Sequence, residues 1–413
     1  MLDTSARISP QNITKELLSQ FEALKASDLH IVSKLPPYFR INGTLTPYGS
    51  QPLTKGLIEH FLKEITDPDI MGGLLGREEI DLSSKFNLGD TEIRLRINMA
   101  LSDQLPYAVI RRLEIIRHSP FQLGLPQEFV DLCEHHTHGV IFITGTTGSG
   151  KSTTLASTLA WLLQRMPYRV ITLEDPIEYL IPTGQGVVTQ REIHRDTKDF
   201  ASALRAAMRQ DPNVILVGEV RDTKTAEALL GAAESGHLVF TTLHVGTATD
   251  VPNRLGSLFD IQEGRAVKER LYNTLAGVLT QTLVPSRKGR SLGWEFLPVG
   301  TEERDLFRNN QFPEIRNRME KKRFRLADCL IRLVSQGLVD TATAKSYCNY
   351  WDEWDEDYLE HFRAQPGLPA QEDSLSSREI VLPSHSSGSS EQTDQHLPAS
   401  ATDFMDDDNL FFP

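Results

Sequence analysis

The sequence predicts an α/β protein built around a doubly wound parallel sheet, and three observations predict this class. Short apolar runs alternate with helical patterns through the middle of the chain, in the order VIFIT, KSTTLASTLAWLLQ, RVITLE, PNVILVGE, TAEALLGAAESG and LVFTTLH. The strand candidates are continuously rich in Val, Ile and Leu, as strands covered on both faces are. A chain of 413 residues, 39% of them hydrophobic, is long enough to bury a large core.

A smaller α+β domain is expected before this region. Leu17, Leu18, Phe21 and Leu24 recur at helical spacing between residues 12 and 26. Strand candidates follow, with an Asn42-Gly43 turn signal among them: DLHIVS, YFRI, EIDLSSKF, EIRLRINMA and YAVIRR. The domain is expected to end near Arg112.

The whole chain is therefore divided into four parts. Residues 1–112 form the small domain, residues 113–126 a linker, residues 127–350 the α/β domain with a helical carboxyl-terminal part, and residues 351–413 a tail. The tail holds fifteen acidic residues against Arg363 and Arg378, and so carries all of the net charge of −13. From about Gln365 it is rich in Ser, Pro, Asp and Glu, and we expect it to be largely disordered.

Composition also bounds the location. No apolar run approaches the roughly 18 residues of a membrane-spanning helix, and the first residues lack the pattern of a secretory signal. Cys133, Cys329 and Cys348 are far apart, which argues against a disulfide framework or a structural zinc site. A cytoplasmic protein is expected.

The sequence GTTGSGKS, between a strand candidate and a strong helix start, fits the phosphate-binding pattern G-x-x-x-x-G-K-[ST]. Glycines let backbone N–H groups turn toward a polyphosphate, and the helix amino terminus adds positive partial charge. Lys151 is expected to reach the β- and γ-phosphates, and Ser152 to ligate Mg²⁺. The expected nucleotide-binding residues are Gly145, Thr146, Thr147, Gly148, Ser149, Gly150, Lys151, Ser152 and Thr153.

Two further segments supply carboxylates for orienting water and holding the metal. ITLEDPIEY places Glu174, Asp175 and Glu178 just after a strand, and NVILVGEVRD places Glu219 at the end of another. The carboxyl ends of parallel strands meet the ligand in such folds. The alternative is that Glu174 and Asp175 cap a turn before Pro176 while Glu178 is only solvated.

Four motifs in this order resemble the secretion and pilus ATPase superfamily, the traffic ATPases. GTTGSGKS, EDPIEY, FASALRAAMRQDPNVILVGEVRD and ESGHLVFTTLH are similar to its Walker A, Asp-box, Walker B and His-box elements. ASDLHIVSKLPPYFRINGTL is similar to the PAS-like amino-terminal domain of its pilus-retraction branch. The resemblance covers about residues 20–350 and implies a RecA-like ATPase domain that binds ATP with Mg²⁺.

The resemblance also implies roles for single residues in a homo-hexamer. Glu178 would activate water, Glu219 would act at Mg²⁺ and the γ-phosphate, and His237 and His244 would couple the site to neighbouring subunits. Without the resemblance, His237 reads as a helix-terminating residue and His244 as a core residue at a strand end. Arg111 matches a family arginine that stabilises the transition state.

The positions of other arginines indicate which branch of the superfamily the chain resembles. Arg96 is a weaker candidate than Arg111, because it also fits the outward face of a strand. A second arginine that is common in retraction motors should fall near Gln104, and it is absent. The chain also lacks the tetracysteine insert of the assembly and export branches, which favours the retraction-like branch or its conjugation and Dot-type relatives.

The hypothesis is therefore an ATP-hydrolysing motor for a type IV pilus, for retraction or twitching, or for a related secretion or conjugation machine. It would lie at the cytoplasmic face of the inner membrane and act on a membrane-embedded platform protein. A nucleic-acid translocase is disfavoured, because residues 1–350 hold equal numbers of acidic and basic residues. A regulatory subunit without turnover is disfavoured by the intact Lys151, Glu178 and Glu219.

Three further features lie outside the motifs of the ATPase. CEHHTHG, which contains Cys133, is more readily a segment before a strand than a metal site. The basic run from Lys321 to Arg325 is more readily a solvated helix face than a surface for nucleic acid or anionic lipid. FMDDDNLFFP in the tail is interpreted as a docking peptide for a partner, with a disordered segment as the alternative.

Overall fold

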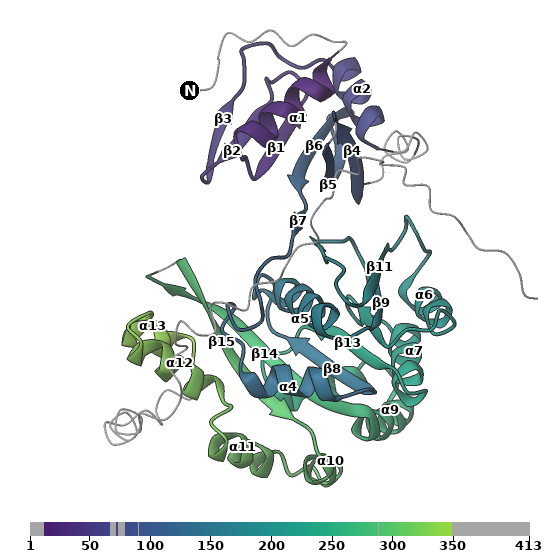
Figure 1. Cartoon of the computed structure of the whole chain (residues 1–413), viewed down its shortest axis with the longest axis vertical. Coiled ribbons are helices and arrows are strands. Elements are labelled where there is room, and N and C mark those ends of the chain that lie inside the picture. The colour runs from purple at the N-terminus through teal and green to yellow at the C-terminus, as the bar shows by residue number, and fades with distance from the viewer. Residues whose placement is uncertain (1–11, 67–71, 73–78, 90, 288, 349–413) are drawn as a thin grey trace, which may run out of the picture. The chain divides into compact units, whose positions relative to one another are not determined.

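The computed structural model describes residues 12–66, 72, 79–89, 91–287 and 289–348, so the predicted acidic tail lies outside the described residues. Within these ranges the chain forms a six-stranded sheet, a seven-stranded sheet and a two-stranded pairing (Figure 1). The predicted division of the chain into four parts stays a prediction.

The six-stranded sheet is antiparallel, with the order β3-β2-β1-β6-β5-β4. Its elements are α1 (Ile13–Ala23), β1 (Asp28–Val32), β2 (Tyr38–Ile41), β3 (Thr44–Pro47), α2 (Lys55–Ile65), β4 (Ile80–Leu88), β5 (Thr91–Ser102) and β6 (Leu105–Arg112). The predicted first helix and strands are confirmed. Helix α2 was not predicted, although Ile58, Phe61, Leu62 and Ile65 follow a helical repeat and are all buried.

Two tight turns in this sheet have positive φ angles, which favour Gly, Asn and Asp. Asn42 and Gly43 have φ values of 50° and 83° between β2 and β3, so the predicted turn is confirmed. Asp103 and Gln104 have φ values of 51° and 60° between β5 and β6. The position where the sequence departs from the family arginine is therefore at a hairpin tip.

The seven-stranded sheet has the order β11-β9-β12-β13-β8-β14-β15. Its strands are β8 (Gly139–Thr144), β9 (Arg169–Glu174), β11 (Val187–Glu192), β12 (Val214–Val217), β13 (Leu238–Leu243), β14 (Leu275–Ser286) and β15 (Gly289–Pro298). All neighbours pair in parallel except β14 and β15. The predicted α/β class with a parallel sheet is confirmed, whereas the β14–β15 hairpin was not predicted.

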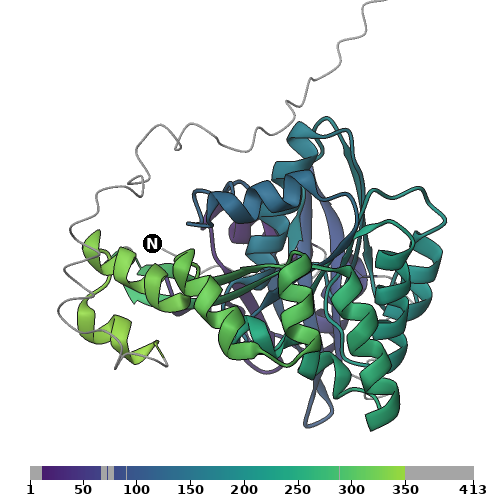
Figure 2. The ribbon, with the colours of Figure 1, turned by 90° about the horizontal axis from the view of Figure 1, so that it is seen from below.

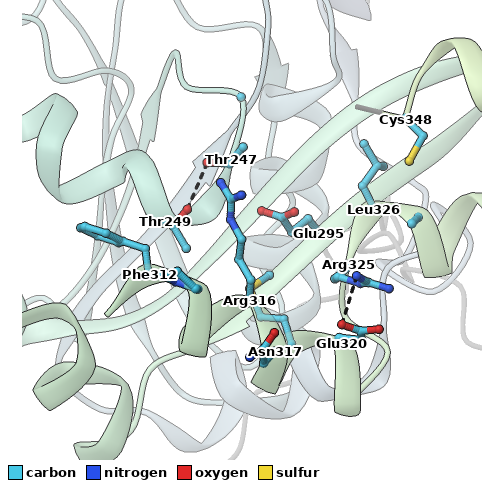
Figure 3. Close-up of a pocket in the computed structure, with 14 residues that line it drawn as sticks. Thr247, Thr249, Glu295, Phe312, Arg316, Asn317, Glu320, Arg325, Leu326 and Cys348 are labelled. Carbon is cyan, nitrogen blue, oxygen red and sulfur yellow. Dashed lines mark hydrogen bonds and ion pairs between the residues drawn. The ribbon is translucent and has the colours of Figure 1, made fainter. Parts of the chain in front are cut away.

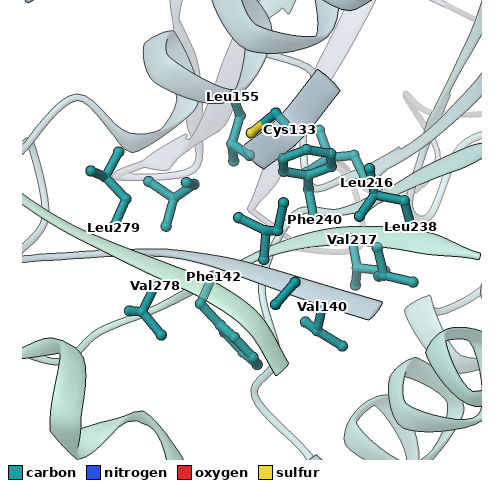
Figure 4. Packing of buried hydrophobic residues seen from close by; sticks show 14 of the residues in the cluster. Cys133, Val140, Phe142, Leu155, Leu216, Val217, Leu238, Phe240, Val278 and Leu279 are labelled. Carbon is teal, nitrogen blue, oxygen red and sulfur yellow. The ribbon is translucent and has the colours of Figure 1, made fainter. Parts of the chain in front are cut away.

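Helices pack on this sheet and cover its apolar strands. They are α4 (Gln127–His135), α5 (Lys151–Arg165), α6 (Phe200–Ala207), α7 (Thr223–Glu234), the short η1 (Ala248–Asp250), α8 (Val251–Gly256) and α9 (Ile261–Thr274). Every residue of β8, β12 and β13 is buried. Phe240 lies in the core on the same side of the sheet as Leu155 of α5, whereas Phe142 projects from the opposite face (Figure 4). Burial on both faces explains why these strands are continuously apolar.

Four more helices follow the hairpin: α10 (Thr301–Arg308), α11 (Phe312–Lys321), α12 (Leu326–Ser335) and α13 (Thr341–Ser346). Helix α12 contacts β15 and α13 contacts β14. These helices belong to the light-green part of the ribbon in Figure 2. The prediction of a helical carboxyl-terminal part is confirmed for these residues. Among the helices that the structure describes, none has the length and apolar character to cross a bilayer.

Two short strands join distant parts of the sequence. The two-residue strands β7 (Glu114–Ile115) and β10 (Tyr179–Leu180) pair in parallel. Strand β10 directly follows Glu178, so this pairing lies beside one of the predicted catalytic residues.

Candidate nucleotide-binding site

The predicted phosphate-binding loop joins the end of β8 to the start of α5. Gly145, Gly148 and Gly150 have φ values of 136°, 78° and 89°, which side chains rarely allow. A Cβ atom on Gly145 would lie 2.2 Å from the backbone oxygen of Gln281 and 2.7 Å from Oγ of Ser149. The loop therefore requires glycine at this position both for its backbone angle and for its close contact with β14.

The rest of the loop presents backbone and small polar groups. Thr146, Thr147 and Gly148 are exposed, and Ser149 is buried. Lys151, Ser152 and Thr153 form the first turn of α5 and are partly exposed. The free N–H groups of this first turn, together with the helix dipole, suit a phosphate group.

The Lys151 side chain folds across the loop. Its Nζ donates to the backbone oxygens of Gly145 at 3.0 Å and Thr146 at 2.9 Å. Burial lowers the pKa of Lys151, while the charges of Glu219 and Glu178 act to raise it. The ammonium group therefore feels the charge of both predicted catalytic carboxylates.

Glu219 lies just beyond the carboxyl end of β12, in a half-buried position. One of its carboxylate oxygens accepts hydrogen bonds from Arg221, with a distance of 2.8 Å from Nε. The other oxygen lies 3.5 Å from Nε2 of His244, which follows β13. Because β12 and β13 are adjacent and parallel, their ends bring Glu219 and His244 together.

Glu178 lies in the segment between β9 and β11 and is exposed. Its Oε1 lies 3.3 Å from the guanidinium group of Arg96 on β5, which also donates to Asp81 at 2.8 Å. Both carboxylates raise the pKa of Arg96. Arg96 is thus the arginine in contact with the predicted catalytic base.

Arg111 and His237 contact residues that are not part of the predicted nucleotide site. The guanidinium of Arg111 donates to Oδ1 of Asp28 at 2.7 Å and 2.9 Å, across the β1–β6 pair. His237 follows α7, and its Nδ1 lies 3.0 Å from the backbone oxygen of Ala232 and 3.0 Å from Oγ of Ser235. Gly236 has a φ of 93°, which is typical of a residue after a helix end.

Sequence reasoning missed two polar residues that hold the site. Gln281 on β14 is 3% exposed, and its Nε2 donates to the backbone oxygen of Ser149 at 2.7 Å. Gln190 on β11 donates to Glu174 and to the backbone of Tyr179. A glutamine inside the apolar run LAGVLTQTLV was a signal for the first, whereas Gln190 gave none because β11 is not an apolar strand.

Glu174 was predicted to cap a turn or to serve the site, and its carboxyl group is enclosed. Oε1 accepts hydrogen bonds from the hydroxyl of Thr172 at 2.6 Å and from Nε2 of Gln190 at 3.1 Å. Burial raises the pKa of Glu174 to about 7, although both hydrogen bonds oppose the change, and the charge of Glu178 adds to it.

The histidine-rich segment CEHHTHG and the basic run from Lys321 to Arg325 are not part of the phosphate-binding loop. In CEHHTHG, Nδ1 of His135 lies 2.7 Å from the backbone oxygen of Asp131 and Nδ1 of His136 lies 3.1 Å from that of Leu132. The basic run includes the last residue of α11 and the turn after it.

A cavity of about 400 Å³ lies beside the basic run (Figure 3). Its lining includes Glu295, Phe312 and Arg316, and none of the predicted nucleotide-site residues. The carboxyl of Glu295 accepts a hydrogen bond from the backbone of Ala248 at 2.8 Å.

The fold and this site define a P-loop nucleotide-binding protein: a glycine-rich loop with one lysine joins β8 to α5, and the Glu219 carboxylate follows β12 of the same sheet. A family model described as "Type II/IV secretion system protein" matches residues 5–365. The chain belongs to this family.

Two curated relatives are similar over much of their length. The "Type IV pilus retractation ATPase PilT" of Pseudomonas aeruginosa is 34% identical over 337 residues, which cover 80% of this chain and 96% of the relative. The "Uncharacterized protein YggR" of Escherichia coli is 39% identical over 274 residues, which cover 66% of this chain and 81% of the relative.

Two solved structures share the fold. The pilus retraction motor PilT with bound ADP has a TM-score of 0.74 and 35% identity, and the match covers 84% of this chain and 98% of that one. The ATPase DotB of Legionella pneumophila also has a TM-score of 0.74, with 28% identity and coverage of 84% and 97%. These matches confirm the predicted resemblance to the pilus and secretion ATPases.

Proposed function

We propose that this chain hydrolyses ATP at the loop of residues 145–152 and drives a type IV pilus or a related secretion machine. The observation that carries the proposal is the position of Lys151, which bridges the loop and feels the charge of both Glu178 and Glu219. The relative named as a pilus retraction ATPase supports the same activity.

Binding of ATP would replace contacts that the loop now makes with itself. Lys151 would turn from the backbone oxygens of Gly145 and Thr146 to the β- and γ-phosphates. The glycine backbone and the first turn of α5 would hold the phosphate oxygens through N–H groups. Ser152, Thr153 and the exposed Thr146 and Thr147 would complete the contact surface.

The donor set near the loop fits Mg²⁺, since it consists of the Ser152 hydroxyl and the Glu219 carboxylate, both hard oxygen ligands. When bound, the ion would neutralise charge on the β- and γ-phosphates. Arg221 and His244 hold the Glu219 carboxylate from two sides and would orient it toward the phosphates.

Glu178 would accept a proton from the attacking water. In the present structure its carboxylate contacts Arg96, so the base would have to exchange this partner for water during turnover. Arg111 is exposed beside Asp28 and would stabilise the γ-phosphoryl group of a neighbouring subunit in a homo-hexamer. His237 and His244 would couple the site to that neighbour.

The type IV pilus retraction machine is the preferred setting, with a platform protein of the inner membrane as the partner and the cytoplasmic face as the location. A secretion or conjugation ATPase is the second candidate, because DotB matches with the same TM-score as PilT. A nucleic-acid translocase has less support, and tight, salt-dependent DNA binding in a filter assay would revive it.

Phosphate release from ATP by the purified full-length chain tests the proposal directly. We expect turnover that requires Mg²⁺ and is lost in Lys151→Ala. Absence of phosphate release, even when the chain has assembled into a ring in the presence of nucleotide, would contradict it. The mass of the assembly, measured by light scattering, tests the hexamer.

A further inference from the structure

The segment from Ile177 to Ile181 carries Glu178, but little regular backbone pairing holds it. Its only strand is the two-residue β10, paired with β7. An exposed glutamate on a loosely paired segment would sample many positions, and a general base has to stay within hydrogen-bonding distance of its water. Side chains of other elements must therefore fix this backbone.

The side chain of Gln190 fixes this backbone through both its amide nitrogen and its amide oxygen. Its Nε2 donates to the backbone oxygen of Tyr179 at 2.8 Å and to Oε1 of Glu174 at 3.1 Å. Its Oε1 accepts from the backbone N–H of Ile181 at 3.0 Å. One side chain of β11 thus binds the backbone immediately after Glu178 at two points.

Two more side chains hold the same segment. Glu192, also on β11 and 1% exposed, accepts the backbone N–H of Ile177 at 3.2 Å, directly before Glu178. Thr153 in the first turn of α5 donates to the hydroxyl of Tyr179 at 3.1 Å. The segment is therefore tied on one side to β11 and on the other to the helix that follows the phosphate-binding loop.

Gln190 also binds the carboxyl group of Glu174. Glu174 lies at the end of β9, four residues before Glu178, and its carboxyl accepts the amide of Gln190 and the hydroxyl of Thr172. The two carboxyl groups are close enough for the charge of Glu178 to disfavour ionisation of Glu174. An amide at position 190 satisfies the enclosed group without adding a third charge.

We propose that Gln190 is a positioning residue that holds the backbone on the carboxyl side of Glu178, so that this carboxylate can reach the water that attacks ATP. The inference rests on the proposed function and deepens it. Gln190 itself touches neither nucleotide nor water in this scheme, and it acts only through the segment that carries Glu178.

Two substitutions of Gln190 test the proposal, and each removes a different set of hydrogen bonds. Gln190→Leu keeps the bulk of the side chain and removes all three hydrogen bonds. Gln190→Glu keeps an acceptor for Ile181 but removes the donor and places a carboxylate beside Glu174. Thr189→Val is the matched control, because Thr189 is the preceding residue of β11 and accepts a hydrogen bond from Arg169 at 2.8 Å, away from Glu178.

We expect kcat for ATP to fall about 10-fold to 100-fold in Gln190→Leu, as a misplaced catalytic group causes. Nucleotide affinity, measured with a fluorescent ATP analogue, should change less than about threefold, because the phosphate-binding loop is untouched. Gln190→Glu should also lose kcat, and Thr189→Val should keep it. Circular dichroism and the thermal midpoint establish that each variant is folded.

A double-mutant cycle separates positioning from a general loss of structure. If Gln190 acts through Glu178, adding Gln190→Leu to Glu178→Gln should lower kcat no further. Multiplied losses in the double variant, or wild-type kcat in a folded Gln190→Leu, would overturn the inference. A wild-type chain that releases no phosphate would instead overturn the proposed function, so the two failures are distinguishable.

Discussion

Nε2 of His244 lies 3.5 Å from Oε1 of Glu219, and the two residues follow the adjacent parallel strands β13 and β12. The second oxygen of Glu219 is bonded to Arg221. A carboxylate held on both sides has little freedom to turn away from the phosphate-binding loop. Substitution of Glu219 should therefore affect ATP hydrolysis more than it affects the local structure.

Glu219→Gln should keep nucleotide binding and lose turnover. Glutamine retains the shape and a hydrogen-bonding oxygen but not the negative charge that Mg²⁺ and the reacting phosphate require. We expect phosphate release to fall by about 10²-fold or more. Glu227→Gln, on the exposed surface of α7, is the control and should match the wild type. Equal turnover in all three proteins would remove Glu219 from the site.

Lys151→Ala should abolish hydrolysis and weaken nucleotide binding, because the loop loses the only cation that it contains. The folded structure should survive, since the side chain bonds only to exposed or loop backbone in the present structure. Isothermal titration with ATP and Mg²⁺ measures binding, and a colorimetric phosphate assay measures turnover. Lys224→Ala on α7 serves as the matched control, and a Lys151→Ala protein with full activity would refute the site.

Much of the parallel sheet and of the phosphate-binding loop could be predicted, because both depend on local sequence. Strands such as β8 and β13 are buried on both faces and so are apolar throughout. The β14–β15 hairpin was not predicted, because β14 combines apolar residues with Gln281 and so does not alternate as a half-buried strand does. Helix α2 has a clear helical repeat of buried residues, although it was not predicted.

The arrangement of the candidate site was only partly predictable. The motifs pointed to Glu178, Glu219 and His244, but Glu178 is contacted by Arg96, which lies 82 positions earlier in the sequence. Gln281 lies 132 positions from the Ser149 that it supports. The polar residue stands out in its apolar run, but a single sequence does not show that it contacts Ser149, because the register between β8 and β14 decides this contact. The PAS-like character of the first domain stays a prediction.

Glu174→Gln should change how stability depends on pH. The pKa of Glu174 is about 7 in the folded chain against an ordinary value of 4.5, so the folded state binds this proton more tightly than the unfolded state. The free energy of unfolding contributed by this group is greatest below the ordinary pKa and falls as the pH rises to about 7. Glutamine cannot ionise, so in the variant this group should no longer lower the free energy of unfolding as the pH rises. Thermal midpoints at pH 5 and pH 8 measure it, with Glu227→Gln as control, and an unchanged difference in Glu174→Gln would contradict the prediction.

Removal of residues 366–413 should leave ATP hydrolysis largely intact, because the predicted site lies wholly between residues 96 and 244. We expect the truncated chain to show the wild-type thermal midpoint within a few degrees and a similar kcat. If the tail docks a partner protein, its loss should affect pilus or secretion activity in cells but not phosphate release from purified protein. Unfolding of the truncated chain would show that the tail is part of the folded structure.

Gly145→Ala should damage the phosphate-binding loop through the backbone alone. The new Cβ would lie 2.2 Å from the backbone oxygen of Gln281, and the φ of 136° is unfavourable for alanine, so either β14 or the loop has to move. We expect nucleotide binding to fall by at least about tenfold, and the thermal midpoint to drop. Gly231→Ala is the matched control, because Gly231 lies within α7 with no atom within 4 Å of the added Cβ. That helix should gain about 0.5–1 kcal/mol of stability from alanine, with binding unchanged. A Gly145→Ala chain that binds ATP like the wild type would mean that the loop does not need its contact with Gln281 to hold a phosphate.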